Sequence, residues 1–375
     1  MILPQEIYDN TDAIILAHGY VGEVLGKTVH GILMHSKVFN TVALIDRSKA
    51  GEDTSKICPG VTKKVPIYSE IDQALVHKPL VVILIGDPSD TNMHEIKRCI
   101  SHGLDVINSS FIFLNDFPEL VELAAKHGKR LIDLRNVKKN WKMPDGSILN
   151  IKAKVVYVTG TDCGLGKRTA AYELTQEAKE RGIKAAFAAT GQTGLMIGCE
   201  GGIIFDAIPT NFAASAVEQL IVDIDKKGHE LIFLEGQGSL MHYACSSVLS
   251  LLHASNPHAI VMVHDAERAY HAAFGESPVF RMCNLLREID LIESLYLPEG
   301  NRYKVAAIAT RGQKNIAEIN KITTLPLADV RQHGGRALLL DATLQHLNKT
   351  YNWLPDYKAS KQISKNLILL DNLKD

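Results

Sequence analysis

The chain has 375 residues, 46% of them hydrophobic and 22% charged, and this length predicts two or three domains with substantial cores. Its 41 basic and 42 acidic residues give a formal net charge of -1, which excludes the strong positive field of a general nucleic-acid or anionic-membrane binder. The longest apolar runs are strand-sized, and the first ten residues lack the pattern of a cleavable leader. We therefore expect a cytoplasmic protein, forming a homo-oligomer, with neither nucleic-acid nor membrane partners.

In the first part of the chain, short β-branched runs alternate with longer amphipathic stretches, a pattern typical of a parallel sheet covered by helices. The predicted strands are Asp12–Ala17, Thr41–Asp46, Leu80–Ile85, Asp105–Asn108 and Arg130–Asp133, and the predicted helices are Gly22–Met34, Met93–His102 and Pro118–Lys126. They predict a Rossmann-like domain over residues 1–140. The glycines after its first strand (Gly19, Gly22 and Gly26) lack the Gly-x-Gly start of a dinucleotide loop, so we favour an auxiliary or oligomerising role over NAD binding.

A basic stretch with Pro144, Asp145 and Gly146 predicts a linker over residues 141–151. A second α/β series follows over residues 152–350, with strands predicted at Lys154–Thr159, Lys184–Ala189, Leu231–Glu235, Ala259–His264 and Lys304–Thr310, and helices at Lys167–Arg181, Phe212–Lys226, Asn284–Leu295 and Gly335–Asn348. Residues 351–375 form a C-terminal extension with a short apolar segment, Leu367–Leu370. The fold class is thus α/β, with two doubly wound parallel-sheet domains, the second similar to P-loop NTPases.

The strongest motif is a glycine-rich loop between a buried strand and a helix, with the sequence Gly160-Thr161-Asp162-Cys163-Gly164-Leu165-Gly166-Lys167-Arg168-Thr169. Glycines let backbone N–H groups converge on a phosphate, and Lys167, which we expect to be exposed, adds a full positive charge. Five residues separate Gly160 from Gly166, one more than in the common P-loop, and Arg168 stands where a hydroxyl usually holds magnesium. We expect all ten residues to form a phosphate-binding site; the alternative is a turn that binds nothing.

In a doubly wound sheet the residues that end the strands line one crevice. Four apolar residues precede Glu235, as in a Walker B strand, so Glu235 is our first candidate for a catalytic base or a metal ligand, against a capping role. His264 ends the next strand and is the second candidate, against a purely structural role. The predicted substrate-binding residues are Gln192, Thr193, Gln237, Arg311 and Arg331; the arginines would hold carboxylates unless they form surface ion pairs.

Two residues inside the loop carry further hypotheses. Asp162 is a carboxylate beside a phosphate site, which favours a catalytic role with a cation or a substrate amine. Cys163 is either a nucleophile activated by the helix start and Lys167, or a small filler. The six cysteines include no C-x-x-C pair, so the sequence indicates no disulfide framework and no metal site.

The loop, together with Gly191-Gln192-Thr193-Gly194 and Glu235-Gly236-Gln237-Gly238-Ser239 behind a Rossmann-like domain, resembles the DgcN-like family of D-glutamate N-acetyltransferases, whose P-loop domain is related to dethiobiotin synthetase. The resemblance covers nearly the whole chain. It implies transfer of an acetyl group from acetyl-CoA to the amine of a small acidic amino acid. Asn211-Phe212 departs from the Asp-Phe pair of the family, which bears on the choice of substrate.

Two other functions use the same loop. One is an ATP-dependent ligase similar to dethiobiotin synthetase, in which Lys167 and Mg²⁺ would activate a carboxylate by phosphorylation. The other is a nucleotide sensor without catalysis. In the acetyltransferase interpretation the loop would hold the phosphates of CoA, and no ATP hydrolysis would be needed.

Overall fold

The computed structural model describes residues 3–23, 26–58, 60–137, 142–245, 247–272, 280–296, 302–332 and 334–355. It divides into two compact units, one made of Met1–Asn140 with Gly191–Cys199, and the other of Trp141–Thr190 with Glu200–Asp375. The predicted apolar segment at residues 367–370 and most of the C-terminal extension lie outside the described residues.

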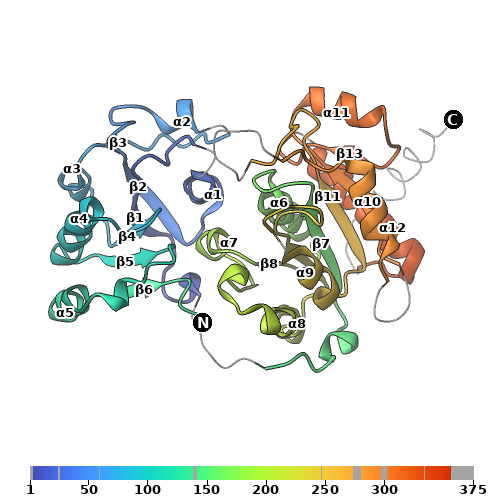
Figure 1. The fold of residues 1–375 in the computed structure, drawn as a ribbon, viewed down its shortest axis with the longest axis horizontal. Coiled ribbons are helices and arrows are strands. Elements are labelled where there is room, and N and C mark those ends of the chain that lie inside the picture. Colours follow the sequence, from blue (N-terminus) through green and yellow to red (C-terminus); the bar gives the residue numbers. More distant parts are fainter. Residues whose placement is uncertain are drawn as a thin grey trace. The chain divides into compact units, whose positions relative to one another are not determined.

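The first unit contains a six-stranded parallel sheet in the order β3-β2-β1-β4-β5-β6, which is the Rossmann strand order (Figure 1). Its strands are β1 (Thr11–Leu16), β2 (Phe39–Ile45), β3 (Ile67–Tyr68), β4 (Val81–Leu84), β5 (Asp105–Asn108) and β6 (Leu131–Asp133). Its helices are α1 (Lys27–His35), α2 (Thr54–Ile57), α3 (Ile71–Leu75), α4 (Asp90–Ser101), α5 (Pro118–His127) and α7 (Gln192–Ile197).

The second unit contains a seven-stranded parallel sheet in the order β13-β12-β11-β7-β10-β8-β9. Its strands are β7 (Lys154–Gly160), β8 (Ala185–Ala189), β9 (Gly201–Gly202), β10 (Leu231–Glu235), β11 (Ala259–Val263), β12 (Val305–Ala309) and β13 (Leu327–Ala328). Its helices are α6 (Lys167–Glu180), α8 (Thr210–Lys226), α9 (Ser247–Ser255), α10 (Leu285–Ser294), α11 (Gln313–Asn320) and α12 (Gly335–Tyr351). Because β7 pairs with both β10 and β11, the loops that follow these three strands meet at one edge of the sheet.

Local sequence explains most of these elements. In α8 the buried apolar residues recur every three or four positions, at Ala213, Val217, Leu220, Ile221 and Ile224, so one face of the helix packs on the core. The central strands β7, β10 and β11 are apolar along their length because helices cover both faces of a parallel sheet. The predicted α/β class with two parallel sheets is confirmed.

Several predicted bounds need correction. The helix expected at Gly22–Met34 begins only at Lys27, because Gly22 has a φ of 82° and residues 18–22 form turns. Gly26 lies so close to Tyr20 that a Cβ there would come within 1.8 Å of the Tyr20 carbonyl oxygen. The two-residue strands β3, β9 and β13 and the helices α2, α3, α7, α9 and α11 were not expected. The short ones offer too few residues for a periodic pattern.

Two segments lie in a different part of the structure than the sequence predicted. Part of the expected linker forms a 3-10 helix, Ser147–Asn150, in which both the backbone N–H and the hydroxyl of Ser147 donate to Glu218 of α8 at 2.9 Å. The segment around α7, expected within the second domain, packs in the first unit, where Thr193 and Thr28 share a buried hydrogen bond of 2.8 Å. Apolar burial along α7 holds it there.

Candidate functional site: a phosphate loop with a buried carboxylate

The glycine-rich loop connects β7 to α6 as the sequence predicted. Gly164 and Gly166 have φ values of 68° and 107°, which favour glycine, and a Cβ on Gly160 would come within 2.7 Å of the Val263 carbonyl oxygen. Leu165 is buried and Thr169 is half-buried. The loop therefore needs its glycines both for backbone conformation and for close packing.

Lys167 is the first residue of α6, and its ammonium donates to the carbonyl oxygen of Asp162 at 2.5 Å. Its exposed fraction is only 7%, so the expectation that Lys167 would be exposed is wrong. The side chain folds back over the loop because the carbonyl groups there offer the charge a partner.

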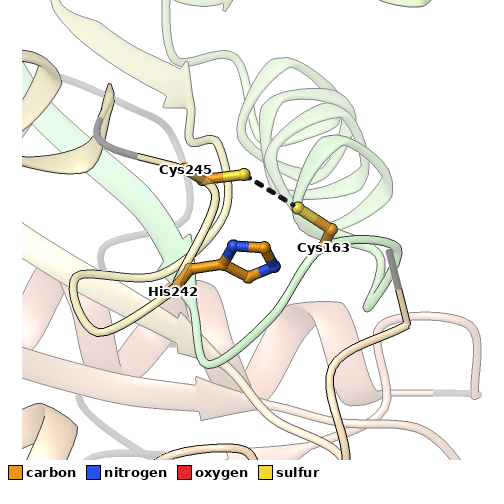
Figure 2. Close-up of side chains that lie close together, drawn as sticks. All are labelled: Cys163, His242 and Cys245. Carbon is orange, nitrogen blue, oxygen red and sulfur yellow. Dashed lines mark hydrogen bonds between the residues drawn. The ribbon is translucent and has the colours of Figure 1, made fainter. Parts of the chain in front are cut away.

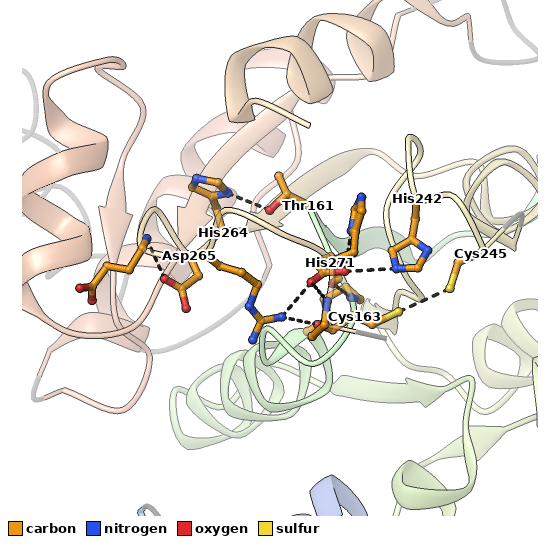
Figure 3. Close-up of polar contacts among 12 residues, drawn as sticks. Thr161, Cys163, His242, Cys245, His264, Asp265 and His271 are labelled. Atoms are coloured by element: carbon orange, nitrogen blue, oxygen red, sulfur yellow. Dashed lines mark hydrogen bonds and ion pairs between the residues drawn. The ribbon is translucent and has the colours of Figure 1, made fainter. Parts of the chain in front are cut away.

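The carboxylate of Asp162 is the centre of a buried polar cluster, and Figure 3 labels two of its members, His242 and His271. Its Oδ1 lies 2.8 Å from Nδ1 of His271 and 3.2 Å from Nε2 of His242, while its Oδ2 accepts from Arg268 at 2.9 Å and from the Ala272 N–H at 3.0 Å. Burial raises the pKa of Asp162, but the hydrogen bonds from His271 and Arg268 outweigh burial and hold the pKa below its ordinary value. Asp162 is thus an anion that shares a hydrogen bond with His271 and lies within ion-pair distance of His242.

Cys163 lies at the edge of this cluster, with its Sγ 3.4 Å from Sγ of Cys245 and its carbonyl oxygen accepting from Arg268 at 2.7 Å. Cys163, His242 and Cys245 each offer a ligand atom, and these atoms lie within 4.8 Å of one another (Figure 2). Asp162, His242 and His271 form a second group of the same kind. Burial lowers the pKa of His242, which favours the neutral ring that metals bind.

Glu235 ends β10 at the same edge of the sheet. It is half-buried and accepts from the Thr190 N–H at 3.1 Å, and Gln237 donates to the Thr190 carbonyl oxygen at 2.8 Å. Burial lowers the pKa of Arg168, whereas the Glu235 carboxylate raises it, so the two side chains interact electrostatically. An arginine charge therefore acts on the carboxylate that corresponds to a Walker B acid.

His264 follows β11 and is held by the loop. Its Nδ1 lies 2.7 Å from the hydroxyl of Thr161, and its carbonyl oxygen accepts from the Thr310 hydroxyl at 2.7 Å. Burial lowers the pKa of His264 to about 4. A ring with so low a pKa is a weak proton acceptor near neutrality, so this geometry favours positioning of Thr161 over proton abstraction.

The residues expected to bind substrate carboxylates have partners within the chain. Arg331 makes a two-point ion pair with Asp329 through Nε and Nη2, at 3.1 and 2.9 Å, and this occupies one of the guanidinium edges that could bind a carboxylate at two points. Arg311 is 53% exposed and lies 3.8 Å from Asp265, a looser pair. Gln192 and Thr193 begin α7 in the first unit, and the hydroxyl of Thr193 is engaged with Thr28.

Four residues of the cluster were missed by the sequence analysis: His242, Cys245, Arg268 and His271. One local signal existed, because His242 and Cys245 have H-x-x-C spacing, a pattern of mixed ligands that a pair of cysteines alone does not represent. Arg268 and His271 lie in an irregular segment after β11, and no local pattern connects them with Asp162, more than 100 positions earlier.

The fold and the loop define a P-loop α/β protein with a Rossmann-like N-terminal domain. Residues 142–339 match a family described as "Domain of unknown function (DUF1611_C) P-loop domain", and residues 47–137 match its N-terminal counterpart, "DUF1611_N Rossmann-like domain". The chain belongs to the DUF1611 family.

Named relatives and a solved structure agree with this family. The chain is 30% identical to a D-glutamate N-acetyltransferase of Tritonibacter scottomollicae over 64% of this chain and 73% of the relative. It is 35% identical to a D-glutamate N-acetyltransferase of Pseudoalteromonas sp over 47% of this chain, and it spans 52% of that relative. A crystal structure of a DUF1611 family protein from Anabaena variabilis, 31% identical, superposes with a TM-score of 0.82 over 90% of this chain and 100% of that one. The predicted family resemblance is confirmed.

No helix in the described part of the chain is both long and apolar enough to cross a membrane.

Proposed function

We propose that this protein is an N-acyltransferase that moves an acetyl group from acetyl-CoA to the amine of a small acidic amino acid such as D-glutamate. The observation that carries the proposal is the similarity to two relatives named D-glutamate N-acetyltransferase, in a chain that has the phosphate loop intact. The loop from Gly160 to Thr169 is proposed to hold phosphates of CoA through its backbone N–H groups and Lys167.

The surroundings of Glu235 support a cofactor that needs no magnesium. In P-loop NTPases a loop hydroxyl and a Walker B acid hold Mg²⁺ between them. Here Arg168 replaces the hydroxyl, and its guanidinium interacts with Glu235. We propose that this positive charge takes the part that a metal ion plays in the ATP-dependent alternatives.

In the proposed reaction, the substrate nitrogen attacks the thioester carbonyl carbon; the C–N bond forms, the C–S bond breaks and CoA leaves as the thiol. The substrate ammonium must first lose a proton, because its ordinary pKa is near 10. Glu235 is the proposed acceptor of this proton, and loop N–H groups would stabilise the charge on the carbonyl oxygen. Arg311, the more weakly paired arginine, is proposed to bind a substrate carboxylate.

Calorimetry with acetyl-CoA and with ATP, each with and without Mg²⁺, tests the choice of cofactor. We expect acetyl-CoA to bind equally well without Mg²⁺, within roughly twofold. Incubation with acetyl-CoA and D-glutamate should then release CoA and form the N-acetyl amino acid, with L-glutamate as the control for chirality. Phosphate release from ATP in step with product would establish a ligase instead, and nucleotide binding without any turnover would establish a sensor.

A further inference from the structure

Two groups of potential metal ligands share His242: Asp162 with His271, and Cys163 with Cys245. They differ in what already occupies their donor atoms. The Asp162 carboxylate takes a guanidinium from Arg268 at 2.9 Å, the Ala272 N–H at 3.0 Å and the His271 ring at 2.8 Å. Arg268 also donates to the Cys163 carbonyl oxygen at 2.7 Å, so its charge lies near both groups. The acidic group is the weaker candidate because its carboxylate oxygens themselves accept from the guanidinium, the Ala272 N–H and the His271 ring.

The sulfur atoms have a separation that suits a shared ion. A tetrahedral Zn²⁺ with Zn–S bonds of about 2.3 Å holds two sulfurs about 3.8 Å apart, whereas a disulfide needs about 2.05 Å. Cys163 and Cys245 have their sulfurs 3.4 Å apart, near the first value, and Figure 2 shows the His242 ring beside this pair.

The loop after β10 carries two of the three potential ligands, His242 and Cys245. His242 and Cys245 have the two-residue spacing common among zinc ligands of a single loop. Gly238, with a φ of 55°, lets Cys245 approach closely, because a Cβ on Gly238 would come within 2.5 Å of the Cys245 Cβ. The position of Cys245 therefore depends on the absence of a side chain at Gly238.

Asp162 lies on the Nε2 side of the His242 ring. Its Oδ1 lies 3.2 Å from Nε2 of His242, and both side chains have no exposed surface. Nδ1 of His242 accepts the Ala244 N–H at 3.1 Å, so coordination of zinc through Nδ1 requires this lone pair to exchange the N–H for the ion. A carboxylate that holds the far nitrogen of a ligating histidine is a recurring feature of zinc sites.

We propose that Cys163, His242 and Cys245 bind one Zn²⁺ ion through two thiolates and one imidazole nitrogen, leaving a fourth position open. Two thiolates balance the charge of the ion, and both cysteines are half-buried, so an outside oxygen or sulfur ligand can reach the fourth position. Three protein ligands with an open position are the pattern of catalytic zinc rather than structural zinc. This proposal does not depend on the proposed acetyl transfer.

The first test uses the unmodified protein, purified under reducing conditions without chelator. Elemental analysis should find about one zinc per chain. After zinc is removed, Co²⁺ should give a near-ultraviolet thiolate-to-cobalt band and intense visible bands of tetrahedral coordination. Cys163 and Cys245 should resist alkylation until a chelator is added. Absence of zinc together with absence of the thiolate–cobalt band, or a Cys163–Cys245 disulfide in the reduced preparation, would overturn the proposal.

Variants locate the ion. Cys163→Ser, Cys245→Ser and His242→Asn should each lose stoichiometric metal, and Asp162→Asn should weaken Co²⁺ affinity about 10- to 100-fold because it acts through His242. Cys283→Ser is the matched control outside the cluster and should bind as wild type. If His271→Asn lost the metal while both cysteine variants kept it, the ion would lie in the Asp162 group and the assignment would be wrong. Circular dichroism identifies any variant that fails to fold. The alkylation experiment uses the unmodified protein, so it tests the proposal even if a variant does not fold.

Discussion

Each unit has a glycine-containing loop after a central strand of its parallel sheet. The two loops differ in the charged side chains that contact them. In the first unit, the buried carboxylate of Asp46, after β2, accepts from the N–H groups of Gly19 and Val21 at 3.1 and 3.2 Å. In the second unit, Lys167 lies over the loop, and Asp162 is held by Arg268, His271 and Ala272.

The comparison shows how the same topology yields two kinds of loop. In the first unit, a carboxylate of the chain itself accepts from the loop N–H groups. Asp46 therefore stabilises the fold of this unit rather than a bound ligand. A loop capped by a lysine presents positive charge, which suits an external phosphate. The two acids at strand ends, Asp46 and Glu235, should therefore differ in whether their loss affects folding or turnover.

The largest effect is expected from Glu235→Gln, which keeps an oxygen for the Thr190 N–H but removes the charge and the base. Turnover should fall about 100- to 10,000-fold, with little change in acetyl-CoA affinity. Steady-state kinetics with calorimetry separates the two effects. Glu230→Gln, at the opposite end of the same strand, is the control and should retain normal turnover. If Glu235→Gln kept more than about a tenth of the activity, another group would be the base.

The next effect is expected from Lys167→Ala, which should weaken acetyl-CoA binding roughly 100- to 1,000-fold through the loss of charge-assisted hydrogen bonds to phosphate. Lys27→Ala is matched to it, because Lys27 also is the first residue of a helix after a glycine, in the first unit. That variant should bind as wild type. Equal binding by both variants, measured by calorimetry, would show that the second loop is merely structural.

A pH effect should follow from His264. Its pKa falls from 6.5 to about 4 on folding, so the fold favours the neutral ring. The corresponding stability, on the order of 3 kcal/mol, is fully present above about pH 6.5 and is lost as the pH falls toward 4. Urea unfolding of the second unit at several pH values should show this slope, and His264→Asn should flatten it. His127→Asn, an exposed change in the first unit, serves as the control. An unchanged slope in His264→Asn would contradict the assignment.

The smallest effect is expected from Asp46→Asn. The new amide turns an N–H₂ group toward N–H donors or leaves one of them unpaired, which costs about 1–3 kcal/mol of unfolding free energy for the first unit. Hydrogen exchange resolved along the chain would show the loss there and leave the second unit unchanged. Acetyl-CoA affinity should also stay unchanged. Loss of cofactor binding without loss of stability would mean that the first loop, too, serves a ligand.

Much of the fold could be predicted from the sequence because its signals are local. The strand Asp105–Asn108 was predicted to the residue, and β7, β10 and β11 to within one residue at either end. Apolar runs bounded by polar turns mark buried strands, and spacings of three and four mark helices such as α8. The glycine spacing from Gly160 to Gly166 likewise predicted the loop, since backbone conformation there requires glycine.

Parts of the site were beyond local patterns. The sequence pointed to His264 as a base, but burial and its contact with Thr161 changed the chemistry of the ring. It offered Arg331 as a carboxylate ligand or as a partner in an ion pair, and the structure shows an ion pair with Asp329. In both cases the residue type was right for the chemistry, and the immediate neighbours decided whether the group was available.

The sequence by itself determined the α/β class, the two parallel sheets and the position of the phosphate loop, because periodicity and glycine placement act over a few residues. Only the tertiary structure decided that Asp162 meets His242 and His271, and that Cys163 meets Cys245. The reason is the order of the strands: β7 pairs with β10 on one side and β11 on the other, which joins loops about 80 to 110 positions apart. No local pattern encodes that pairing, since it is selected by the packing of the whole sheet.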